Sequence, residues 1–169
     1  MSWSEPLRRI AVVGMVLGLG ATLGACSFSP VYSGTLASQP MLNLAYAKPT
    51  TRLHQVIYQE LTLRFGSSDA PTAPLASVTT STSSGAVGLS KTSNPNEPHR
   101  VTVTATLTIT SRDGTEAAPM AFTRTASADY TTSGQVLADT AAATEATERA
   151  AKATAESLRL AVLAALGRQ

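Results

Sequence analysis

The chain has 169 residues, 43% of them hydrophobic, and its 13 Lys and Arg nearly balance its 11 Asp and Glu, which gives a formal net charge of +2. This length and composition suit a folded domain with a hydrophobic core rather than a disordered segment. The small net charge gives no argument for nucleic-acid binding, which depends on a strongly basic surface. Because the chain has one cysteine, an internal disulfide cannot hold the fold together.

Residues 1–25 have the three parts of a bacterial signal peptide. Arg8 and Arg9 precede an apolar run that is too short to cross a bilayer as a permanent helix, and the small residues Gly and Ala end it. Cys26 follows at the position where lipoprotein processing attaches diacylglycerol to a thiol before the chain is cut. We therefore predict that residues 1–25 are removed and that Cys26 carries a lipid anchor. The alternative is an ordinary secretory signal, or a core helix that ends in cysteine.

Ser27, the residue after the cysteine, bears on where the lipid is inserted. No aspartate stands there to suggest retention in the inner membrane, so the outer membrane of a double-membraned bacterium is the expected destination. Two or three acyl chains would each contribute about 0.8 kcal/mol per buried CH₂, which is enough for stable anchoring. Residues 26–40, which include Pro30 and Gly34, are expected to form a lipidated tether ahead of one domain over residues 41–169.

A strand and an amphipathic helix are predicted at the start of this domain. Residues 41–46, Met-Leu-Asn-Leu-Ala-Tyr, predict a strand that Pro49 ends. Thr50 or Thr51 can cap the helix that follows, and Gly66 supplies its C-terminal end. The apolar residues that recur at helical spacing are Leu53, Val56, Ile57, Leu61 and Phe65.

The middle of the domain predicts three strands. Residues 75–84 are rich in Thr and Ser and predict a weak edge strand, and the polar stretch 85–98 predicts a loop. In residues 101–110 apolar side chains alternate with threonines, so that one face of this strand belongs to the core and the other presents hydroxyls. The alternation resumes over residues 120–130, after the turn signal Asp-Gly at 113–114.

The length of this turn sets the register of the last two strands. A two-residue turn would pair Leu107 with Met120 and Ala105 with Phe122. Pro119 has no N–H to donate to a ladder, so it either starts the last strand after a longer loop or faces an open edge.

A long final helix is predicted over residues 135–166, which contain neither Gly nor Pro and end before Gly167. Its many alanines would let it lie close on a sheet. Two i,i+4 ion pairs are expected on its exposed side, Glu145–Arg149 and Glu148–Lys152.

Residues suited to catalysis or metal binding are scarce. The two histidines, His54 and His99, have no Cys, Asp or Glu at metal-ligand spacing, and the chain has no Gly-rich phosphate loop and no G-x-S-x-G motif. The sequence therefore predicts a protein that is not an enzyme and that needs no cofactor.

Four cations are candidates for contact with anionic groups: Lys91, Arg100, Arg112 and Arg124. The strand alternation directs Arg124 toward the core side, where its stem can pack while its head reaches solvent or an acidic neighbour. A guanidinium is also well suited to phosphate. A solvated surface charge and a contact to an anionic head group both remain open for each of the four.

Several strings resemble, in their order, the LPS-assembly lipoprotein LptE family in its alphaproteobacterial form. Residues 26–32, Cys-Ser-Phe-Ser-Pro-Val-Tyr, are similar to the family's opening Cys-Gly-Phe-x-Pro-Leu-Tyr and depart from it at Ser27 and Val31. Residues 55–65 are similar to its first helix, residues 128–138 to its last strand running into the final helix, and residues 147–151 and 158–161 to later turns of that helix.

The resemblance implies an α+β two-layer sandwich, with two helices packed on a four-stranded, mostly antiparallel sheet. It also implies a protein without enzymatic activity that sits as a plug in the lumen of an LptD-like outer-membrane β-barrel, faces the periplasm, helps the barrel to assemble and binds lipopolysaccharide on its way to the outer leaflet. Residues 75–98 depart from the family pattern by their richness in Ser and Thr, and no lipopolysaccharide-contact residue of the family carries over. Two alternatives are an auxiliary lipoprotein of a lipid-transporting ABC system and a structural envelope lipoprotein without cargo.

Overall fold

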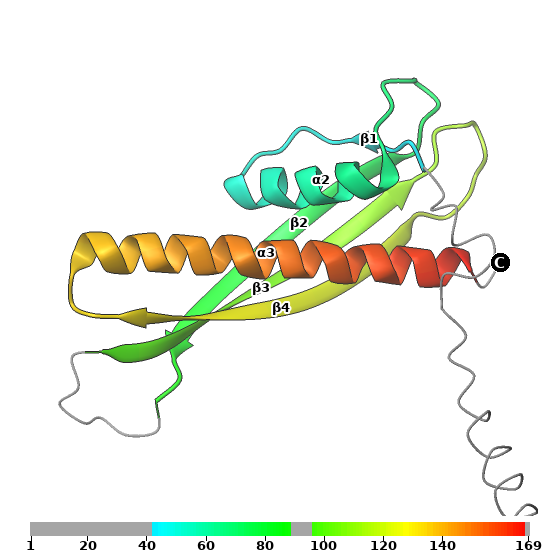
Figure 1. Cartoon of the computed structure of the whole chain (residues 1–169). Coiled ribbons are helices and arrows are strands. Elements are labelled where there is room, and N and C mark those ends of the chain that lie inside the picture. Colours follow the sequence, from blue (N-terminus) through cyan, green and yellow to red (C-terminus); the bar gives the residue numbers. More distant parts are fainter. Residues whose placement is uncertain (1–41, 89–95, 168–169) are drawn as a thin grey trace, which may run out of the picture. The chain divides into compact units, whose positions relative to one another are not determined.

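The computed structural model describes residues 42–88 and 96–167. Its elements are β1 (Ala45–Tyr46), α2 (Arg52–Phe65), β2 (Leu75–Ala86), β3 (Glu97–Thr110), β4 (Met120–Thr132) and α3 (Val136–Leu166) (Figure 1). Both helices lie on one face of a four-stranded sheet, which confirms the predicted two-layer α+β sandwich. The predicted signal peptide, the tether with Cys26, and Lys91 lie outside the described residues.

The sheet is mixed and its strands follow the order β1-β2-β3-β4. β1 runs parallel to β2, whereas β2 with β3 and β3 with β4 are antiparallel pairs. The β2–β3 register runs without a break from Leu75 opposite Thr110 to Ala86 opposite His99. The sheet is therefore mostly antiparallel, as predicted.

The first strand is shorter than the predicted residues 41–46. Only Ala45 and Tyr46 pair with β2. Asn43 has a φ of 45° and its N–H donates to the carbonyl of Phe65 at 2.9 Å, at the end of α2. The backbone around Asn43 is thus bonded to the helix end instead of to β2, so the strand starts later than predicted but ends at Tyr46 as predicted.

The register of the last two strands differs by two residues from the two-residue-turn prediction. Leu107 lies opposite Phe122 and Ile109 opposite Met120. The loop is longer because the Asp113 carboxylate accepts hydrogen bonds from Ser111 Oγ at 2.6 Å and from the Thr115 N–H at 3.0 Å. The shift is an even number of residues, so every side chain keeps its predicted face. β4 begins directly after Pro119, which confirms the predicted alternative in which the last strand starts there after a longer loop.

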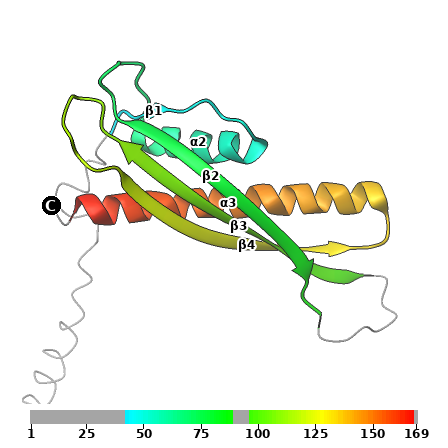
Figure 2. The ribbon, with the colours of Figure 1, turned by 180° about the vertical axis from the view of Figure 1, so that it is seen from behind.

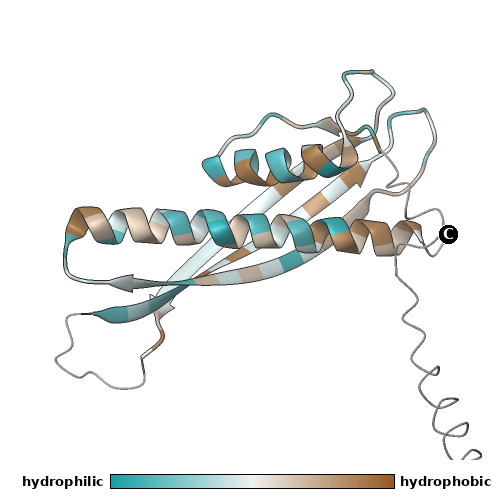
Figure 3. Ribbon diagram, viewed as in Figure 1, coloured by the Kyte–Doolittle hydropathy of each residue, from teal (hydrophilic) through white to brown (hydrophobic). Residues whose placement is uncertain are grey.

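The core lies between the helices and the inward face of the sheet. The inward residues of β3 are buried: Val101, Val103, Ala105, Leu107 and Ile109. The buried residues of α2 are Val56, Ile57, Tyr58, Leu61 and Phe65. α3 contributes alanines in its middle and larger residues toward its more hydrophobic C-terminal part (Figure 3). The fully buried Thr154 hydroxyl lies 2.8 Å from the Ala150 carbonyl of its own helix and 3.2 Å from the Val103 carbonyl, and the second contact shows how closely the alanine-rich stretch approaches β3.

Local sequence signals explain both ends of α2 and one ion pair of α3. Thr51 caps α2 by accepting from the His54 N–H at 3.1 Å, and Gly66, with a φ of 76°, ends it.

On α3, Arg149 pairs with Glu145 at 3.3 Å as predicted. The other predicted pair, Glu148–Lys152, is replaced by a contact between helices. Glu148 accepts from Arg52 Nε of α2 at 3.0 Å, because the packing of the helices brings an Arg closer than the i+4 Lys.

Candidate functional site

The structure does not gather the predicted cations into one cluster. Arg100 lies near the start of β3, and Arg112 lies in the exposed loop after its end, so about 30 Å of strand separates them. Arg100 already has an anionic partner, because its guanidinium donates to both carboxylate oxygens of Asp129, at 2.7 and 2.8 Å. These hydrogen bonds lower the pKa of the Asp129 carboxyl and raise that of Arg100.

Arg124 lies in the middle of β4, opposite Ala105 and on the helix side of the sheet. This is the face that the alternation predicts, yet the residue is exposed because β4 is an edge strand. Its Nη1 donates to the carbonyl of Thr123 at 2.7 Å. Of the described candidates, Arg112 and Arg124 thus have guanidinium groups without a carboxylate partner in the described part of the chain.

The sheet face opposite the helices carries many hydroxyl groups. Neither of the two described helices lies over this face (Figure 2). We call this surface the hydroxyl face. It comprises Ser77, Thr79, Ser81, Ser83, Thr102, Thr104, Thr106, Thr108, Thr123, Thr125 and Ser127. Hydroxyl groups of β3 and β4 are hydrogen-bonded across the strands in three pairs: Thr102–Ser127 at 2.8 Å, Thr104–Thr125 at 2.9 Å and Thr106–Thr123 at 2.8 Å. The paired hydroxyls order this uncharged polar surface.

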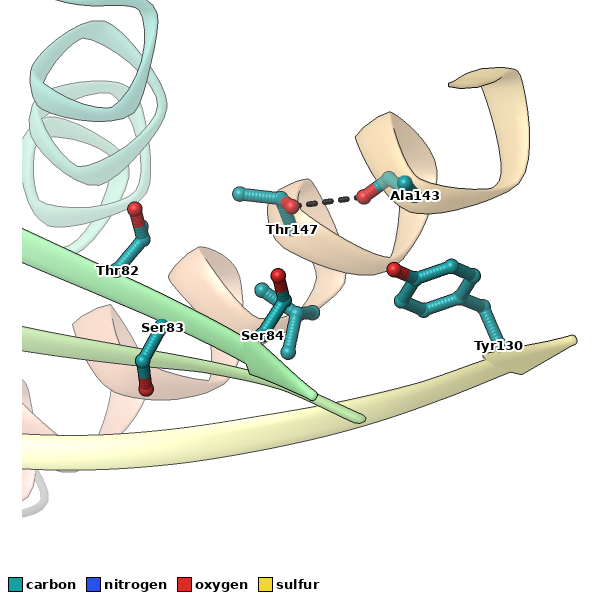
Figure 4. Close-up of a pocket in the computed structure, with 7 residues that line it drawn as sticks. Thr82, Ser83, Ser84, Tyr130, Ala143 and Thr147 are labelled. Carbon is teal, nitrogen blue, oxygen red and sulfur yellow. Dashed lines mark hydrogen bonds between the residues drawn. The ribbon is translucent and has the colours of Figure 1, made fainter. Parts of the chain in front are cut away.

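A small polar pocket of about 160 Å³ lies on the helix side, between the far end of β2 and the N-terminal half of α3 (Figure 4). Thr82 and Ser84 point toward α3, whereas Ser83 points to the hydroxyl face. Tyr130 and Thr147 complete the polar lining; the Thr147 hydroxyl donates to the Ala143 carbonyl at 2.7 Å. The ring of His99 lies beside that of Tyr130, with centroids 5.4 Å apart. None of the lining residues is charged at neutral pH.

An apolar cleft of about 360 Å³ opens at the other end of the sheet. Its lining includes Leu42, Leu44, Ile109, Met120, Val162 and Leu166. The cleft lies where the described chain begins and where α3 ends. Ser111, which also lines it, directly precedes Arg112, so an exposed guanidinium belongs to the loop beside a mostly apolar opening.

A wider groove of about 690 Å³ runs along α2. Tyr46, Tyr58 and Leu63 contribute to it, and Leu63 is 78% exposed. Burial raises the pKa of both tyrosines. Both hydroxyls are hydrogen-bonded to backbone groups, Tyr46 to the Gly66 carbonyl at 3.2 Å and Tyr58 to the Val78 N–H at 2.9 Å.

The described part of the chain contains neither a cluster of metal ligands nor a helix suited to crossing a membrane. Within residues 42–88 and 96–167, no three His, Cys, Asp or Glu side chains come together to hold an ion. In these same ranges neither helix combines the length and apolar character that a membrane crossing needs.

Sequence reasoning missed two structurally important residues. Tyr58 belongs to the buried side of α2, and its spacing from Leu61 and Phe65 is helical, so the periodicity could have found it. Arg159 is 7% exposed and donates from Nε to Glu156 at 2.9 Å. No local pattern distinguishes this arginine from the exposed Arg149 on the same helix.

Comparisons with known proteins show the fold. Neither a scan against protein-family models nor a search of curated proteins gives a match. Among solved structures, a candidate lipoprotein from Caulobacter crescentus CB15 aligns with a TM-score of 0.53 at 16% identity, over 76% of this chain and 94% of the other. A minor lipoprotein from Acinetobacter baumannii aligns with a TM-score of 0.51 at 17% identity, over 69% of this chain and 84% of the other. The rare lipoprotein B from Shewanella oneidensis aligns with a TM-score of 0.55 at 13% identity, over 75% of this chain and 96% of the other.

Proposed function

We propose that this protein is a lipid-anchored envelope lipoprotein of the LptE type. In this proposal Cys26 holds it at the inner leaflet of the outer membrane. The domain occupies the lumen of an LptD-like β-barrel, which it helps to assemble, and it binds lipopolysaccharide in transit. The observation that carries the proposal is the agreement between the lipidation pattern before Cys26 and a fold that is similar to three bacterial lipoproteins.

The hydroxyl face supports a position inside a barrel. The interior of a transmembrane β-barrel is polar, so a domain that fills it needs a polar outer surface that does not bring unpaired charges with it. The residues that define the hydroxyl face are uncharged, and the Arg100 and Asp129 side chains at the end of the same sheet face are paired with each other. Each hydroxyl of its cross-strand pairs keeps hydrogen-bonding capacity for a partner.

The apolar cleft supports the binding of an acylated, phosphorylated ligand. Acyl chains gain about 0.8 kcal/mol for each CH₂ that leaves water. The cleft offers partly exposed apolar side chains such as Leu42 and Met120, and Arg112 in the adjacent loop can bind a phosphate. A juxtaposed apolar opening and exposed guanidinium suits the lipid A part of lipopolysaccharide better than either feature alone.

This ligand mode gives a matched pair of variants. Arg112→Ala is expected to weaken lipopolysaccharide binding about tenfold, the effect of losing one charge-assisted hydrogen bond. Arg100→Ala, at the other end of β3, is the control and should leave affinity unchanged, because Asp129 already occupies that guanidinium. Arg124→Ala tests whether Arg124, the other described candidate without a carboxylate partner, contributes to lipopolysaccharide binding. Equal affinities for Arg112→Ala and the unsubstituted protein would refute the assignment.

The partner is tested by affinity purification of the acylated protein from outer membranes in mild detergent, with identification by mass. The proposal predicts a large β-barrel protein in stoichiometric amount, and loss of that partner when Cys26→Ser removes the anchor. Recovery of ABC-transporter components would favour an auxiliary lipoprotein, and recovery of no partner would favour a structural envelope lipoprotein.

A further inference from the structure

The far part of β2 is an edge with no neighbouring strand among the described residues. β1 pairs only with Leu75 and Ala76, at the start of β2. The chain then turns away into α2, while β2 continues to Ala86 with β3 on its other side. We call the segment Thr80–Ala86 the open edge.

The direction of the free backbone groups follows from the hydrogen bonds at the start of the strand. The carbonyls of Pro74 and Ala76 accept hydrogen bonds at 2.9 Å from the N–H groups of Ala45 and Ala47. The backbone N–H and C=O groups of even-numbered β2 residues therefore point toward the β1 side of the strand. The next such group, the Val78 N–H, donates to the Tyr58 hydroxyl at 2.9 Å. Beyond Val78, the described chain offers no hydrogen-bond partner on this side to the backbone groups of the even-numbered residues: Thr80, Thr82, Ser84 and Ala86.

The open edge lacks the features that usually protect an exposed strand. Edge strands are normally shielded by Lys or another charge, by proline, by a bulge or by a covering element. The segment Thr-Ser-Thr-Ser-Ser-Gly-Ala contains no charge and no proline, and its register with β3 has no bulge. α2 lies over the other end of the sheet, where β1 pairs (Figure 1). The β4 edge, by contrast, carries Arg124.

The polar pocket lies beside this edge. Thr82 and Ser84 alternate toward α3 and line the pocket, while their own backbone groups face the open side. A strand added here would place alternate side chains above the same face of the sheet, next to Thr147. Because the lining is neutral and the volume is about 160 Å³, the pocket suits a small uncharged side chain.

We propose that the open edge receives an extended, uncharged segment of the barrel partner as an added β-strand, with one of its small side chains in the polar pocket. Seven residues of β2 offer about 23 Å of edge. This inference rests on the proposed function. Because the wall of a closed barrel has no free strand edge, the segment is a loop or terminal arm of the partner rather than a wall strand. It continues the line of pairing that β1 begins.

The test is residue-resolved hydrogen exchange on the full acylated chain, alone and in the purified complex with the barrel. The proposal predicts that the amides of Thr80, Thr82 and Ser84 exchange rapidly in the isolated chain and about tenfold or more slowly in the complex. The amides of Ser81 and Ser83 face β3, so they should be slow in both. This alternation distinguishes strand addition from general shielding by a nearby surface.

A matched pair of variants separates backbone pairing from side-chain contact. Thr82→Pro removes the outward N–H but leaves the ladder to β3, and proline is tolerated on strand edges. It should reduce recovery of the barrel about tenfold. Thr82→Val keeps that N–H and should retain recovery. Thermal melting of both variants checks that each is folded, and the exchange measurement on the unsubstituted chain decides the matter if Thr82→Pro does not fold.

The outcomes separate this inference from the function on which it rests. A recovered barrel with unchanged exchange at the even-numbered amides would overturn strand addition and leave the plug proposal intact. Recovery of no barrel would overturn both. Slow exchange at these amides in the isolated chain, with a dimer mass by light scattering, would assign the edge to a second copy and overturn the proposal.

Discussion

Substituting Tyr58 by Phe tests the junction between the covered and open parts of β2. The Tyr58 hydroxyl accepts from the Val78 N–H at 2.9 Å, and both residues are buried, 7% and 5% exposed. Phenylalanine keeps the ring and its packing but leaves this N–H without a partner. An unsatisfied buried donor costs about 1–3 kcal/mol, so the free energy of unfolding should fall by that amount, out of a total on the order of 5–15 kcal/mol.

Urea unfolding followed by circular dichroism measures this change. Tyr46→Phe is the matched control, because its hydroxyl makes a longer bond, 3.2 Å to the Gly66 carbonyl, in a half-buried position. We expect that control to cost less than about 1 kcal/mol. Equal stabilities of Tyr58→Phe and the unsubstituted protein would refute the argument that this hydroxyl satisfies a buried N–H.

Ionisation of Tyr58 makes the stability difference between the unsubstituted protein and Tyr58→Phe depend on pH, and the sign of that dependence follows from its pKa. Burial raises the pKa of Tyr58 above its ordinary value of 10.0, and the Val78 N–H partly offsets this rise. Folding therefore favours the neutral phenol, whose contribution is complete below pH 10 and is lost as the pH rises through the folded-state pKa. The stability difference between the unsubstituted protein and Tyr58→Phe should be constant below pH 10 and shrink above it.

Three further predictions concern the core, the β3–β4 loop and the sheet surface. Leu107→Ala should lower the free energy of unfolding by about 2–5 kcal/mol in urea titrations, since Leu107 is fully buried; a loss below 1 kcal/mol would contradict its place in the core. The Asp113 carboxyl should titrate with a pKa of about 2 by NMR, chiefly because Ser111 Oγ donates to it, and Ser111→Ala should move that pKa upward. Arg100→Ala should leave the free energy of unfolding nearly unchanged, because its pair with Asp129 is exposed, while raising the pKa of the Asp129 carboxyl; an unchanged pKa would rule out the pair in solution.

The sequence predicted the elements whose two faces differ chemically. The strand around Leu107 was clear because apolar residues alternate with threonine, and the amphipathic pattern that includes Phe65 located α2. The β3–β4 register was not predictable from Asp-Gly alone, because Asp113 binds Ser111 and Thr115 and so builds a longer loop. A two-residue signal carries no information about such contacts.

The candidate site was less predictable because it depends on contacts between distant segments. The sequence identified Arg100 and Arg112 as candidate cations. It did not show that they lie toward opposite ends of β3, or that Asp129 pairs with Arg100. The polar pocket combines residues of β2, β3, β4 and α3, which no local pattern connects. The open edge likewise follows from the pairing of β1 with only the first two residues of β2, which the apolar run in residues 41–46 did not predict.

The most direct test of the account is photocrosslinking from the hydroxyl face in living cells. A photoreactive residue at Thr104, in the acylated chain, should form a covalent adduct whose mass identifies an outer-membrane β-barrel protein, and Cys26→Ser should abolish that adduct. An adduct with an ABC-transporter component, or none from this exposed face, would contradict the placement of the domain inside a barrel.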